Sequence, residues 1–290
     1  MKNGFKNKLQ IWQWSVLAVV FFVAVTLLVL QSLLGSKITT VAFLDVGQGD
    51  SIFIQAPNGV QVLVDAGPDV GVVRSLSQVM PFWDRSIDLI IPTHADQDHI
   101  GGFPEILKRF KITSIFDTSN VASTSIYEEY AKLRDDEKVP IRIASFEDAI
   151  VLDKESGVYL RVLYPDQNVS ELPRNESSTI LQLVHGDIEV MLTGDAGVMV
   201  EDYLVGRYNS FLESEILKAG HHGSKTSTSD LFLQAVDPQV VVISAGEDSR
   251  YGHPHQEVVE RIKSRAIPIL ETSREGTIIF EIDGENVWRK

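Results

Sequence analysis

The 290-residue chain predicts an α/β fold in which two mixed β-sheets pack back to back and helices cover both outer faces. Three observations support this prediction. Strand-like and helix-like segments come in two similar halves, without an internal repeat or a low-complexity tract. The strand-like segments alternate apolar and polar residues between Gly and Pro-Asn-Gly turns, and the helix-like segments place apolar residues three and four positions apart. This order of segments favours a layered fold.

The first half begins with three short strands, because apolar residues alternate at 41–44, 51–54 and 60–64 and turns separate these segments. A short helix is predicted at 72–79, where the periodicity ends before Pro81. The later elements of this half are a strand at 88–91, a helix at 101–110, a strand at 111–116, a helix at 125–134 and two or three strands within 139–163.

The second half opens with a predicted hairpin. Strands at 180–184 and 188–192 flank the tripeptide His185-Gly186-Asp187, which makes His185 a turn residue in this prediction. A polar stretch at 166–178 predicts a loop at the rim of a functional site. The remaining elements are a helix at 197–208, a strand at 215–219, a helix at 229–235, a strand at 239–244, a helix at 256–265 and strands at 267–271 and 277–282.

Four candidate metal ligands stand within six residues, directly after the predicted strand at 88–91: His94, Asp96, Asp98 and His99. A strand that ends in such a turn and continues into a helix can aim several side chains at one point. Imidazole suits zinc, manganese and iron, and carboxylate suits harder ions. The alternative is a polar loop in which Asp98 caps the helix, but two His and two Asp at this spacing favour a metal site.

The pattern H-x-D-x-D-H resembles the H-x-H-x-D-H signature of the metallo-β-lactamase superfamily, with Asp96 in place of the second His. This replacement, together with the Ile-Gly-Gly that follows, resembles the soluble domain of ComEC-type competence proteins and their stand-alone relatives. The resemblance covers about residues 38–290. Further segments resemble motifs of that family in the same order: DVGQGDS at 45–51, VLVDAG at 62–67, LTGD at 192–195, KAGHHGS at 218–224 and YGHPH at 251–255.

This resemblance implies a four-layer αββα sandwich with one or two divalent ions, Zn²⁺ or Mn²⁺, with Mg²⁺ as a further option. In the family pattern the first ion site takes His94 and Asp96, and the second takes Asp98, His99 and a late histidine, while Asp195 bridges the two. Two ions can activate a water molecule and stabilise the leaving oxygen, so no serine or cysteine nucleophile is needed. Asp98 is therefore expected to be essential for catalysis.

The sequence does not decide which residue fills two of the ligand positions. The third ligand of the first site, a His in many relatives, has its nearest candidate in Asn175, whose neutral amide is a weak ligand. With Asp96 nearby, this shifts the preference of the first site toward Mn²⁺ or Mg²⁺. Either His221 or His222 is the late ligand. Because adjacent residues at a strand end point in opposite directions, only one is expected to bind directly; the position before Gly223 favours His222, which leaves the other to contact substrate.

Other residues are expected around the ions. Asp65, at a predicted strand end, would orient the ligands from behind, or would serve only as a turn residue. Lys218, Ser224 and Lys225 offer cationic and hydroxyl groups that suit a phosphodiester or another anionic substrate. His253 is expected either to protonate the leaving alkoxide as a general acid or to be a structural histidine.

The N-terminal region resembles a membrane anchor. Residues 1–10 contain three lysines and no acid, and residues 14–34 contain no charged residue, which is about the length that spans a bilayer. The charge bias places the N-terminus inside and the body outside. We therefore predict a cytoplasmic tail and single transmembrane helix in 1–36 and an extracytoplasmic hydrolase domain in 37–290. A cleaved signal peptide is the alternative, although no clear A-x-A cleavage site follows the apolar segment.

The amino-acid composition limits the kinds of metal ligand and of substrate contact that are possible. Cysteine is absent, which excludes disulfides and thiolate metal ligands. The net charge of −14 does not suit a protein that binds polyanions over its whole surface, because such proteins are usually basic. If nucleic acid is the substrate, the attraction must be local, from metal ions and a few cationic side chains.

The sequence thus predicts a membrane-anchored, metal-dependent phosphodiesterase, and the resemblance implies a DNA nuclease of DNA uptake. One hydrophobic span cannot form a DNA channel, so a separate channel protein is an expected partner. Two alternatives stay open: a hydrolase of cell-envelope phosphoesters, and a non-catalytic metal-binding protein, which the incomplete first site would suit. Asp96 and the missing third histidine do not fit β-lactam hydrolysis.

Overall fold

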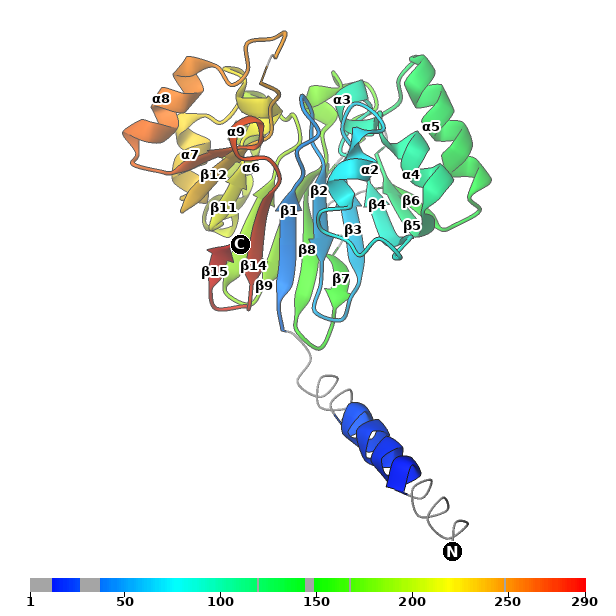
Figure 1. Cartoon of the computed structure of the whole chain (residues 1–290). Coiled ribbons are helices and arrows are strands. Elements are labelled where there is room, and N and C mark those ends of the chain that lie inside the picture. The colour runs from blue at the N-terminus through cyan, green and yellow to red at the C-terminus, as the bar shows by residue number, and fades with distance from the viewer. Residues whose placement is uncertain (1–11, 27–36, 119, 144–148, 167, 248) are drawn as a thin grey trace, which may run out of the picture. The chain divides into compact units, whose positions relative to one another are not determined.

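The structure is a computed structural model that describes residues 12–26, 37–118, 120–143, 149–166, 168–247 and 249–290. The chain divides into two compact units, Met1–Lys37 and Ile38–Lys290. In the first unit, residues 12–26 are helical. The second unit contains all the sheets and helices described below (Figure 1).

The predicted membrane anchor and the single-pass, extracytoplasmic location derived from it need correction. Within the described segments, no helix is both long and apolar enough to cross a membrane. Residues 27–34 of the predicted span, and the lysines of the predicted tail, lie outside the described residues.

Two mixed sheets form the centre of the second unit. The larger sheet has the strand order β15 (Val287–Arg289), β14 (Ile278–Ile282), β1 (Thr39–Phe43), β2 (Ile52–Gln55), β3 (Gln61–Val64), β4 (Ser86–Ile91), β5 (Lys111–Asp117) and β6 (Ile141–Ile143). The smaller sheet has the order β13 (Ile269–Glu271), β12 (Val240–Ile243), β11 (Ile216–Lys218), β10 (Ile188–Leu192), β9 (Ile180–His185), β8 (Val158–Tyr164) and β7 (Ala149–Asp153).

Helices cover the outer face of each sheet (Figure 1). The larger sheet is covered by α2 (Gly71–Leu76), α3 (Gln97–Ile100), α4 (Phe103–Arg109) and α5 (Ser125–Asp136), and the smaller sheet by α6 (Val198–Tyr208), α7 (Asp230–Val236) and α8 (Gln256–Ser264). Short elements complete the unit: α9 (Thr272–Glu275) and the 3₁₀ turns η1 (Asn175–Ser177), η2 (Asn209–Leu212) and η3 (Gly220–Gly223).

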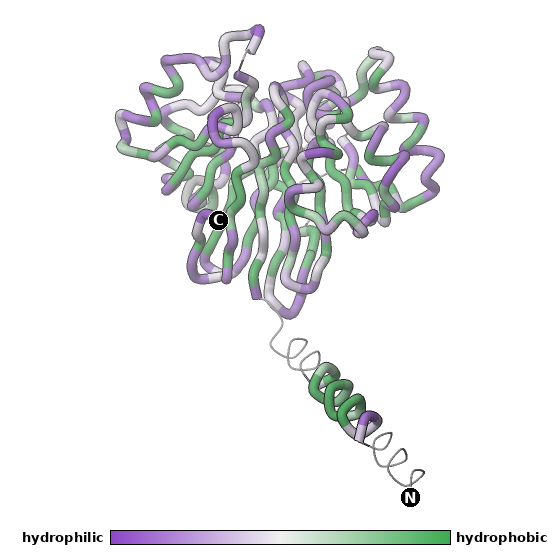
Figure 2. Tube along the Cα trace, in the orientation of Figure 1, coloured by the Kyte–Doolittle hydropathy of each residue, from purple (hydrophilic) through white to green (hydrophobic). Residues whose placement is uncertain are grey.

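Three hydrophobic cores separate these layers, and alternation along the strands assigns residues to them. On β3, Val64 belongs to the core between the two sheets, whereas its neighbour Leu63 packs outward with Phe103 of α4. On the smaller sheet, Leu217 packs outward with Phe232 of α7. Hydrophobic stretches follow the strands, while the outer helices mix hydrophobic and hydrophilic residues (Figure 2). The α/β fold with two sheets and outer helices is therefore confirmed.

Parallel pairing determines where a site can form. Strands β3, β4 and β5 are parallel neighbours in one sheet, and β10, β11, β12 and β13 are parallel neighbours in the other. The carboxyl ends of parallel strands meet at one edge of a sheet, where ligands of α/β proteins usually bind. Four of the six motifs found in the sequence, at 62–67, 94–99, 192–195 and 218–224, follow or overlap such a strand end.

His185 and the last strand of the larger sheet differ from the sequence prediction. His185 is not a turn residue: it is the last residue of β9, it is buried, and its Nδ1 lies 2.9 Å from Oγ1 of Thr39. The turn lies one residue later, where Gly186 has a φ of +61° and a β-carbon would lie 2.2 Å from the carbonyl oxygen of Gly284. The strand β15 was not predicted, because its residues carry little alternation of their own.

Candidate metal centre

The predicted ligands gather at loops that follow strands of both sheets. The loop after β4 carries His94 and leads into α3, the helix that contains Asp98 and His99. Asp195 follows β10, and the 3₁₀ turn η3 after β11 contains His221 and His222. These loops come from both sheets, so the candidate centre lies where the two sheets meet at their carboxyl edges.

Asp65 holds the first of these loops in place. It follows β3 with a left-handed φ of +57°, and its carboxylate accepts hydrogen bonds from the backbone N–H of Thr93 (2.7 Å) and the hydroxyl of Thr93 (2.8 Å). Its Oδ2 also lies 2.7 Å from Nδ1 of His99. A carboxylate bound to one ring nitrogen fixes the orientation of the other. Asp65 thus occupies the position of a residue that orients His99 from behind.

His221 and His222 do not sit on a strand, contrary to the assumption behind the sequence prediction. Strand β11 ends at Lys218, and both histidines have a left-handed backbone, with φ of +46° and +53°. Such a conformation is uncommon for residues other than glycine and often marks functional sites. Because of this turn, both rings point toward Asp195, but toward different oxygens: Nε2 of His221 lies 3.7 Å from Oδ2, and Nε2 of His222 lies 3.5 Å from Oδ1.

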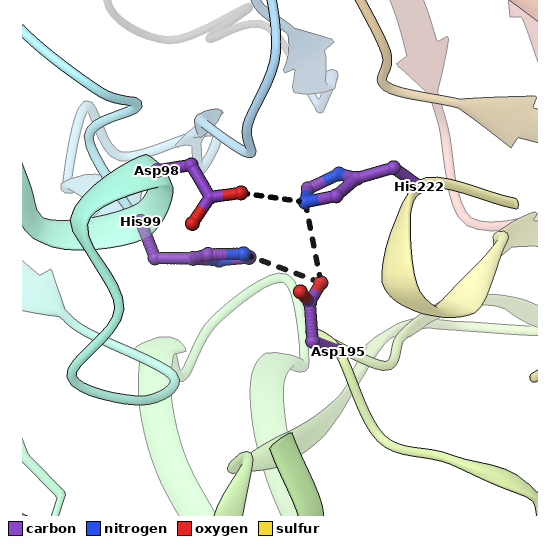
Figure 3. A group of neighbouring side chains, drawn as sticks. All are labelled: Asp98, His99, Asp195 and His222. Carbon is purple, nitrogen blue, oxygen red and sulfur yellow. Dashed lines mark ion pairs between the residues drawn. The ribbon is translucent and has the colours of Figure 1, made fainter. Parts of the chain in front are cut away.

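Four side chains form a compact group of donors: Asp98, His99, Asp195 and His222 (Figure 3). Nε2 of His99 lies 3.2 Å from Oδ1 of Asp195, and Nε2 of His222 lies 3.3 Å from Oδ2 of Asp98. One donor atom from each residue lies within 4.8 Å of the others. The structure therefore brings together the residues that the family pattern assigns to the second ion site, with His222 in the position of the late histidine.

The chemistry of these donors fits a divalent ion. Nε2 of His99, Nε2 of His222 and Oδ1 of Asp195 are buried, and none has a hydrogen-bond partner within the described part of the chain. A buried polar atom without a partner is costly, and a shared cation would satisfy all three at once. Two imidazoles with two carboxylates form a donor set that Zn²⁺, Mn²⁺ and Fe²⁺ accept.

The other oxygen of Asp195 faces a second set of donors. Its Oδ2 lies 3.9 Å from Nε2 of His94 and 3.7 Å from Nε2 of His221. Nε2 of His94 also lies 3.5 Å from Oδ2 of Asp96, whereas Oδ1 of Asp96 lies 2.8 Å from Nε of Arg174. The carboxylate of Asp195 thus separates two groups of donors, which is the geometry that a bridging ligand requires. On the first side, His221 faces the same oxygen of Asp195 as His94 and is a third candidate donor beside His94 and Asp96.

Lys218 was predicted to face the substrate, but the structure buries it completely. Its ammonium contacts the carboxylate of Asp50 and donates a hydrogen bond to the carbonyl oxygen of Gly194 (2.8 Å). Asp50 in turn lies 3.4 Å from Nδ1 of His222. Lys218 therefore cannot reach a substrate, and we assign it to the support of the donor group.

A further set of donors, Asp50, Asp65 and His99, lies close together behind the group of four. The ammonium of Lys218 already supplies a cation to Asp50 at this place. A carboxylate paired with a buried ammonium is poorly suited to a metal ion as well. This inner set is therefore better explained as support for His99 than as another ion site.

The close packing of the four donor residues shifts their pKa values. Burial alone would raise the pKa values of Asp98 and Asp195, but the contacts with His222 and the charge of His99 outweigh burial and hold both pKa values below their ordinary range. Burial alone would lower the pKa of His222, but Asp195 and Asp50 raise this pKa to about 9. For His99, Asp195 and Asp65 likewise outweigh burial and raise the pKa well above its ordinary value. In the metal-free protein, protons bound to His99 and His222 are thus stabilised by the same carboxylates that would face a cation.

The remaining predicted residues occupy less central positions. Asn175 places its amide nitrogen 3.3 Å from both ring nitrogens of His221, beside the first group of donors. Ser224 is buried, and its hydroxyl bonds to Thr226 within the turn (3.0 Å). Lys225 is exposed, and its backbone N–H, not its ammonium, makes the hydrogen bond that the structure shows, to Nδ1 of His255. The geometry therefore favours a substrate role for neither Ser224 nor Lys225.

His253 lies close to both late histidines. Its ring centroid is 5.3 Å from that of His221, 6.2 Å from that of His222 and 5.7 Å from that of Tyr251, whose ring stacks on it. Burial, with a smaller contribution from His221, lowers the pKa of His253 to about 4. The ring is therefore neutral at pH 7, and this does not favour its predicted role as a general acid.

Two cavities open beside the donors, and they share one set of lining residues. The larger has a volume of about 950 Å³ and extends along residues 120–124 and 170–176. The smaller, of about 390 Å³, extends past Tyr251 and His253. The residues that line both cavities are Asp96, Thr124, Arg174, Asp195 and His221.

Sequence analysis missed two residues of this site. Arg174 belongs to the polar stretch 166–178, which was predicted as a rim loop without a role for its side chain. Asp50 lies in the DVGQGDS segment, which was used only for the resemblance. The signal for Asp50 was a carboxylate directly before the predicted strand at 51–54, whereas nothing local distinguishes Arg174 from a solvent-exposed cation.

Comparisons with known proteins agree with this geometry. The family model of the metallo-beta-lactamase superfamily matches residues 44–247. Among curated proteins, "ComE operon protein 3" of Bacillus subtilis is 32% identical over 257 residues, which cover 83% of this chain and 32% of that protein. "Competence protein ComA" of Neisseria gonorrhoeae is 30% identical over 244 residues, which cover 81% of this chain and 31% of that protein.

Among solved structures, the metallo-beta-lactamase fold protein YhfI from Bacillus subtilis superposes with a TM-score of 0.55 at 12% identity, over 87% of this chain and 100% of that chain. This likeness shows the fold alone. The chain spans about a third of the length of the two curated relatives. Because the family model matches most of the chain and both relatives are at least 30% identical over more than four fifths of it, the chain belongs to the metallo-beta-lactamase superfamily and is related to the ComEC-type competence proteins.

Proposed function

We propose that this metallo-beta-lactamase superfamily hydrolase is a metal-dependent phosphodiesterase that cleaves nucleic acid. One observation carries the proposal: Asp98, His99, Asp195 and His222 converge, the last three with a buried donor atom that lacks a hydrogen-bond partner among the described residues, and Asp98, Asp195 and His222 line an open cavity. Donors that only stabilised the fold would not need to border the cavities. This arrangement suits an ion that is reached by a substrate.

The residues of the site would have separate roles in this reaction. A divalent ion held by the four donors would supply a Lewis acid and lower the pKa of bound water. Asp195 would keep the two groups of donors at a fixed distance, because each of its oxygens faces one group. Asp65 would hold the ring of His99 in the orientation that the ion needs, and the carbonyl oxygen of Ser244, 2.9 Å from Nδ1, would do the same for His222, with Asp50 nearby. The nearby cavities would receive the substrate.

Nucleic acid is the favoured substrate because of the relatives. Two of them carry the names "Competence protein ComA" and "Recombination protein 2", the latter from Haemophilus influenzae at 28% identity over 81% of this chain. Competence and recombination both handle DNA strands. The channel protein that the resemblance implies as a partner stays a prediction.

The proposal is tested by incubating the purified full chain with single-stranded DNA, double-stranded DNA and bis-p-nitrophenyl phosphate. Each is combined with Mn²⁺, Mg²⁺ or Zn²⁺, beside the Asp98→Ala variant and the Asp202→Ala variant as a control for an exposed aspartate of α6. We expect DNA cleavage that needs a metal, disappears in Asp98→Ala and persists in Asp202→Ala.

Other outcomes would change the assignment. Turnover of the small diester without DNA cleavage would favour a phosphoesterase with another substrate, such as a cell-envelope phosphoester. Bound metal without turnover of any substrate would favour the non-catalytic metal-binding alternative. DNA cleavage that persists in Asp98→Ala would place the nuclease activity outside the donor group.

A further inference from the structure

Arg174 stands at the junction of the two cavities. It lies in the loop just before η1, and its Nε is 2.8 Å from Oδ1 of Asp96. Its side chain is 45% exposed, so that much of the guanidinium region can be reached from solvent. Among the described residues that line either cavity, Arg174 is the only arginine or lysine.

This position matters because the rest of the chain repels anions. The net charge is −14, so an anionic substrate must be attracted locally. The two lysines proposed for this role from the sequence do not provide the attraction: Lys218 is fully buried against Asp50, and Lys225 does not line either cavity in the described structure. Arg174 is thus the cationic side chain left to meet the substrate at the cavities.

The chemistry of the guanidinium suits a phosphate group. A guanidinium carries five N–H donors in a rigid planar arrangement that matches the oxygens of carboxylates and phosphates. The ion pair between Nε and Asp96 holds the side chain beside the donors. A side chain that is already oriented loses less conformational entropy when its N–H groups bind a second anion.

The two cavities indicate which kind of phosphate ester fits. One is lined by residues within 120–124 and 170–176 and the other by Tyr251 and His253, and Arg174 and Asp195 line both. A phosphodiester carries two ester groups. Each would occupy one cavity, while the charged phosphate oxygens lie at the shared residues. A monoester would leave one cavity empty.

We propose that Arg174 binds the anionic oxygens of a phosphodiester whose two substituents occupy the two cavities, so that the site selects diesters over monoesters. This inference rests on the proposed phosphodiesterase function. It adds a substrate-binding residue and a substrate class within that function. Asp96, in this account, positions Arg174 as well as facing His94.

The test compares the full-length protein with Arg174→Ala, Arg174→Lys and the control Lys225→Ala, all loaded with Mn²⁺. The substrates are bis-p-nitrophenyl phosphate as the diester and p-nitrophenyl phosphate as the monoester. We expect Arg174→Ala to raise KM for the diester at least tenfold, because a charge-assisted hydrogen bond to the substrate is lost. The KM of Arg174→Lys for the diester should lie between those of Arg174→Ala and the unaltered protein. The KM of Lys225→Ala should match that of the unaltered protein.

Two further measurements separate binding from structural support. Metal content should be unchanged in Arg174→Ala, and calorimetry with inorganic phosphate should show at least tenfold weaker binding. If KM and phosphate binding stay unchanged while metal content falls, Arg174 acts only through Asp96 and the inference is wrong. If the unaltered protein turns over the monoester as efficiently as the diester, the assignment of the two cavities is wrong.

The phosphate titration also distinguishes this inference from the proposed function. If the metal-loaded protein turns over neither ester, the proposed function fails. Weaker phosphate binding by Arg174→Ala would still support the anion-binding role of Arg174 in that case. Equal phosphate binding by the unaltered protein and Arg174→Ala, or no phosphate binding by either, would overturn that role whether or not turnover occurs.

Discussion

The ammonium of Lys218 contacts the carboxylate of Asp50, and both side chains are fully buried behind the candidate metal ligands. Asp50 continues this contact to Nδ1 of His222, 3.4 Å away. A buried ion pair stabilises a fold little more than apolar residues of the same size would. Removing one partner is nevertheless strongly destabilising, because the other charge is left buried without a counter-charge. The pair thus keeps a buried carboxylate beside His222, whose Nδ1 lies 2.9 Å from the carbonyl oxygen of Ser244.

This relationship predicts a specific pattern of stability changes. Lys218→Met should lower the free energy of unfolding of the metal-free protein by about 3–5 kcal/mol, because it leaves Asp50 buried without a counter-charge. Urea unfolding measures this change. Lys225→Met, at an exposed position, should stay within about 0.5 kcal/mol of the unaltered protein.

The double variant Lys218→Met/Asp50→Leu separates lost charge from lost packing. It should be more stable than Lys218→Met alone, because the Asp50 carboxylate is no longer buried without its counter-charge. A single variant that is as stable as the unaltered protein would contradict the account of the pair.

The two late histidines should differ in their effect on metal binding. His222→Ala removes a member of the group of four donors and should weaken binding of the first equivalent of Mn²⁺ by about 100-fold or more, since even residues that only orient ligands contribute about 10–100-fold. His221→Ala should leave this equivalent bound, because His221 faces the other oxygen of Asp195. Calorimetric titration gives both affinities; the reverse order would show that His221 is the late ligand of the group.

Asp195 should matter for both groups of donors. Asp195→Ala removes Oδ1, which lies 3.2 Å from His99, and Oδ2, which lies 3.9 Å from His94. We therefore expect Asp195→Ala to lose all tightly bound metal, whereas Asp202→Ala on α6 should retain the metal content of the unaltered protein. Elemental analysis after gel filtration measures this content. A variant that keeps the full metal content would rule out the bridging role of Asp195.

The stability of the metal-free protein should depend on pH in a defined direction. The pKa of His222 rises from an ordinary 6.5 to about 9 because Asp195 and Asp50 outweigh burial. A raised pKa contributes stability that is complete below pH 6.5 and is lost as the pH rises through about 9. The lowered pKa values of Asp98 and Asp195 keep both ionised across this window, so they add no slope.

Urea unfolding of the metal-free protein at pH 6, 7.5 and 9.5 tests this direction. The unfolding midpoint should fall as the pH rises, and His222→Gln should show a weaker fall. Metal affinity should change in the opposite sense, because an ion displaces protons from His222 and His99 more easily at high pH. A midpoint that rises from pH 6 to pH 9.5 would contradict the raised pKa of His222.

Local patterns predicted most of the elements, and the reason is physical. Strands such as β1, β3 and β10 carry the apolar alternation that burial on one or both faces demands, and α4 carries apolar residues on one face. The order of strands within each sheet depends on contacts between distant segments. The pairing of β1 with β14, for example, joins Val41 to Phe280 and has no local signature.

The site was predictable where ligands stand close together in the sequence. His94, Asp98 and His99 fall within one loop and helix, so their convergence follows from local geometry. The directions of His221 and His222 could not be predicted, because their left-handed backbone departs from the strand that the sequence suggested. The burial of Lys218 and the exposure of Arg174 depend on tertiary packing, which a charged residue in a motif does not reveal.

The central claim is that Asp98, His99, Asp195 and His222 hold a divalent ion. The most direct measurement is a crystal structure of the protein soaked in Mn²⁺, with anomalous diffraction data collected near the manganese absorption edge. The account predicts an anomalous peak between Nε2 of His99, Nε2 of His222, Oδ1 of Asp195 and Asp98. A structure with full Mn²⁺ exposure but no peak there, or with its strongest peak away from these four residues, would contradict the account.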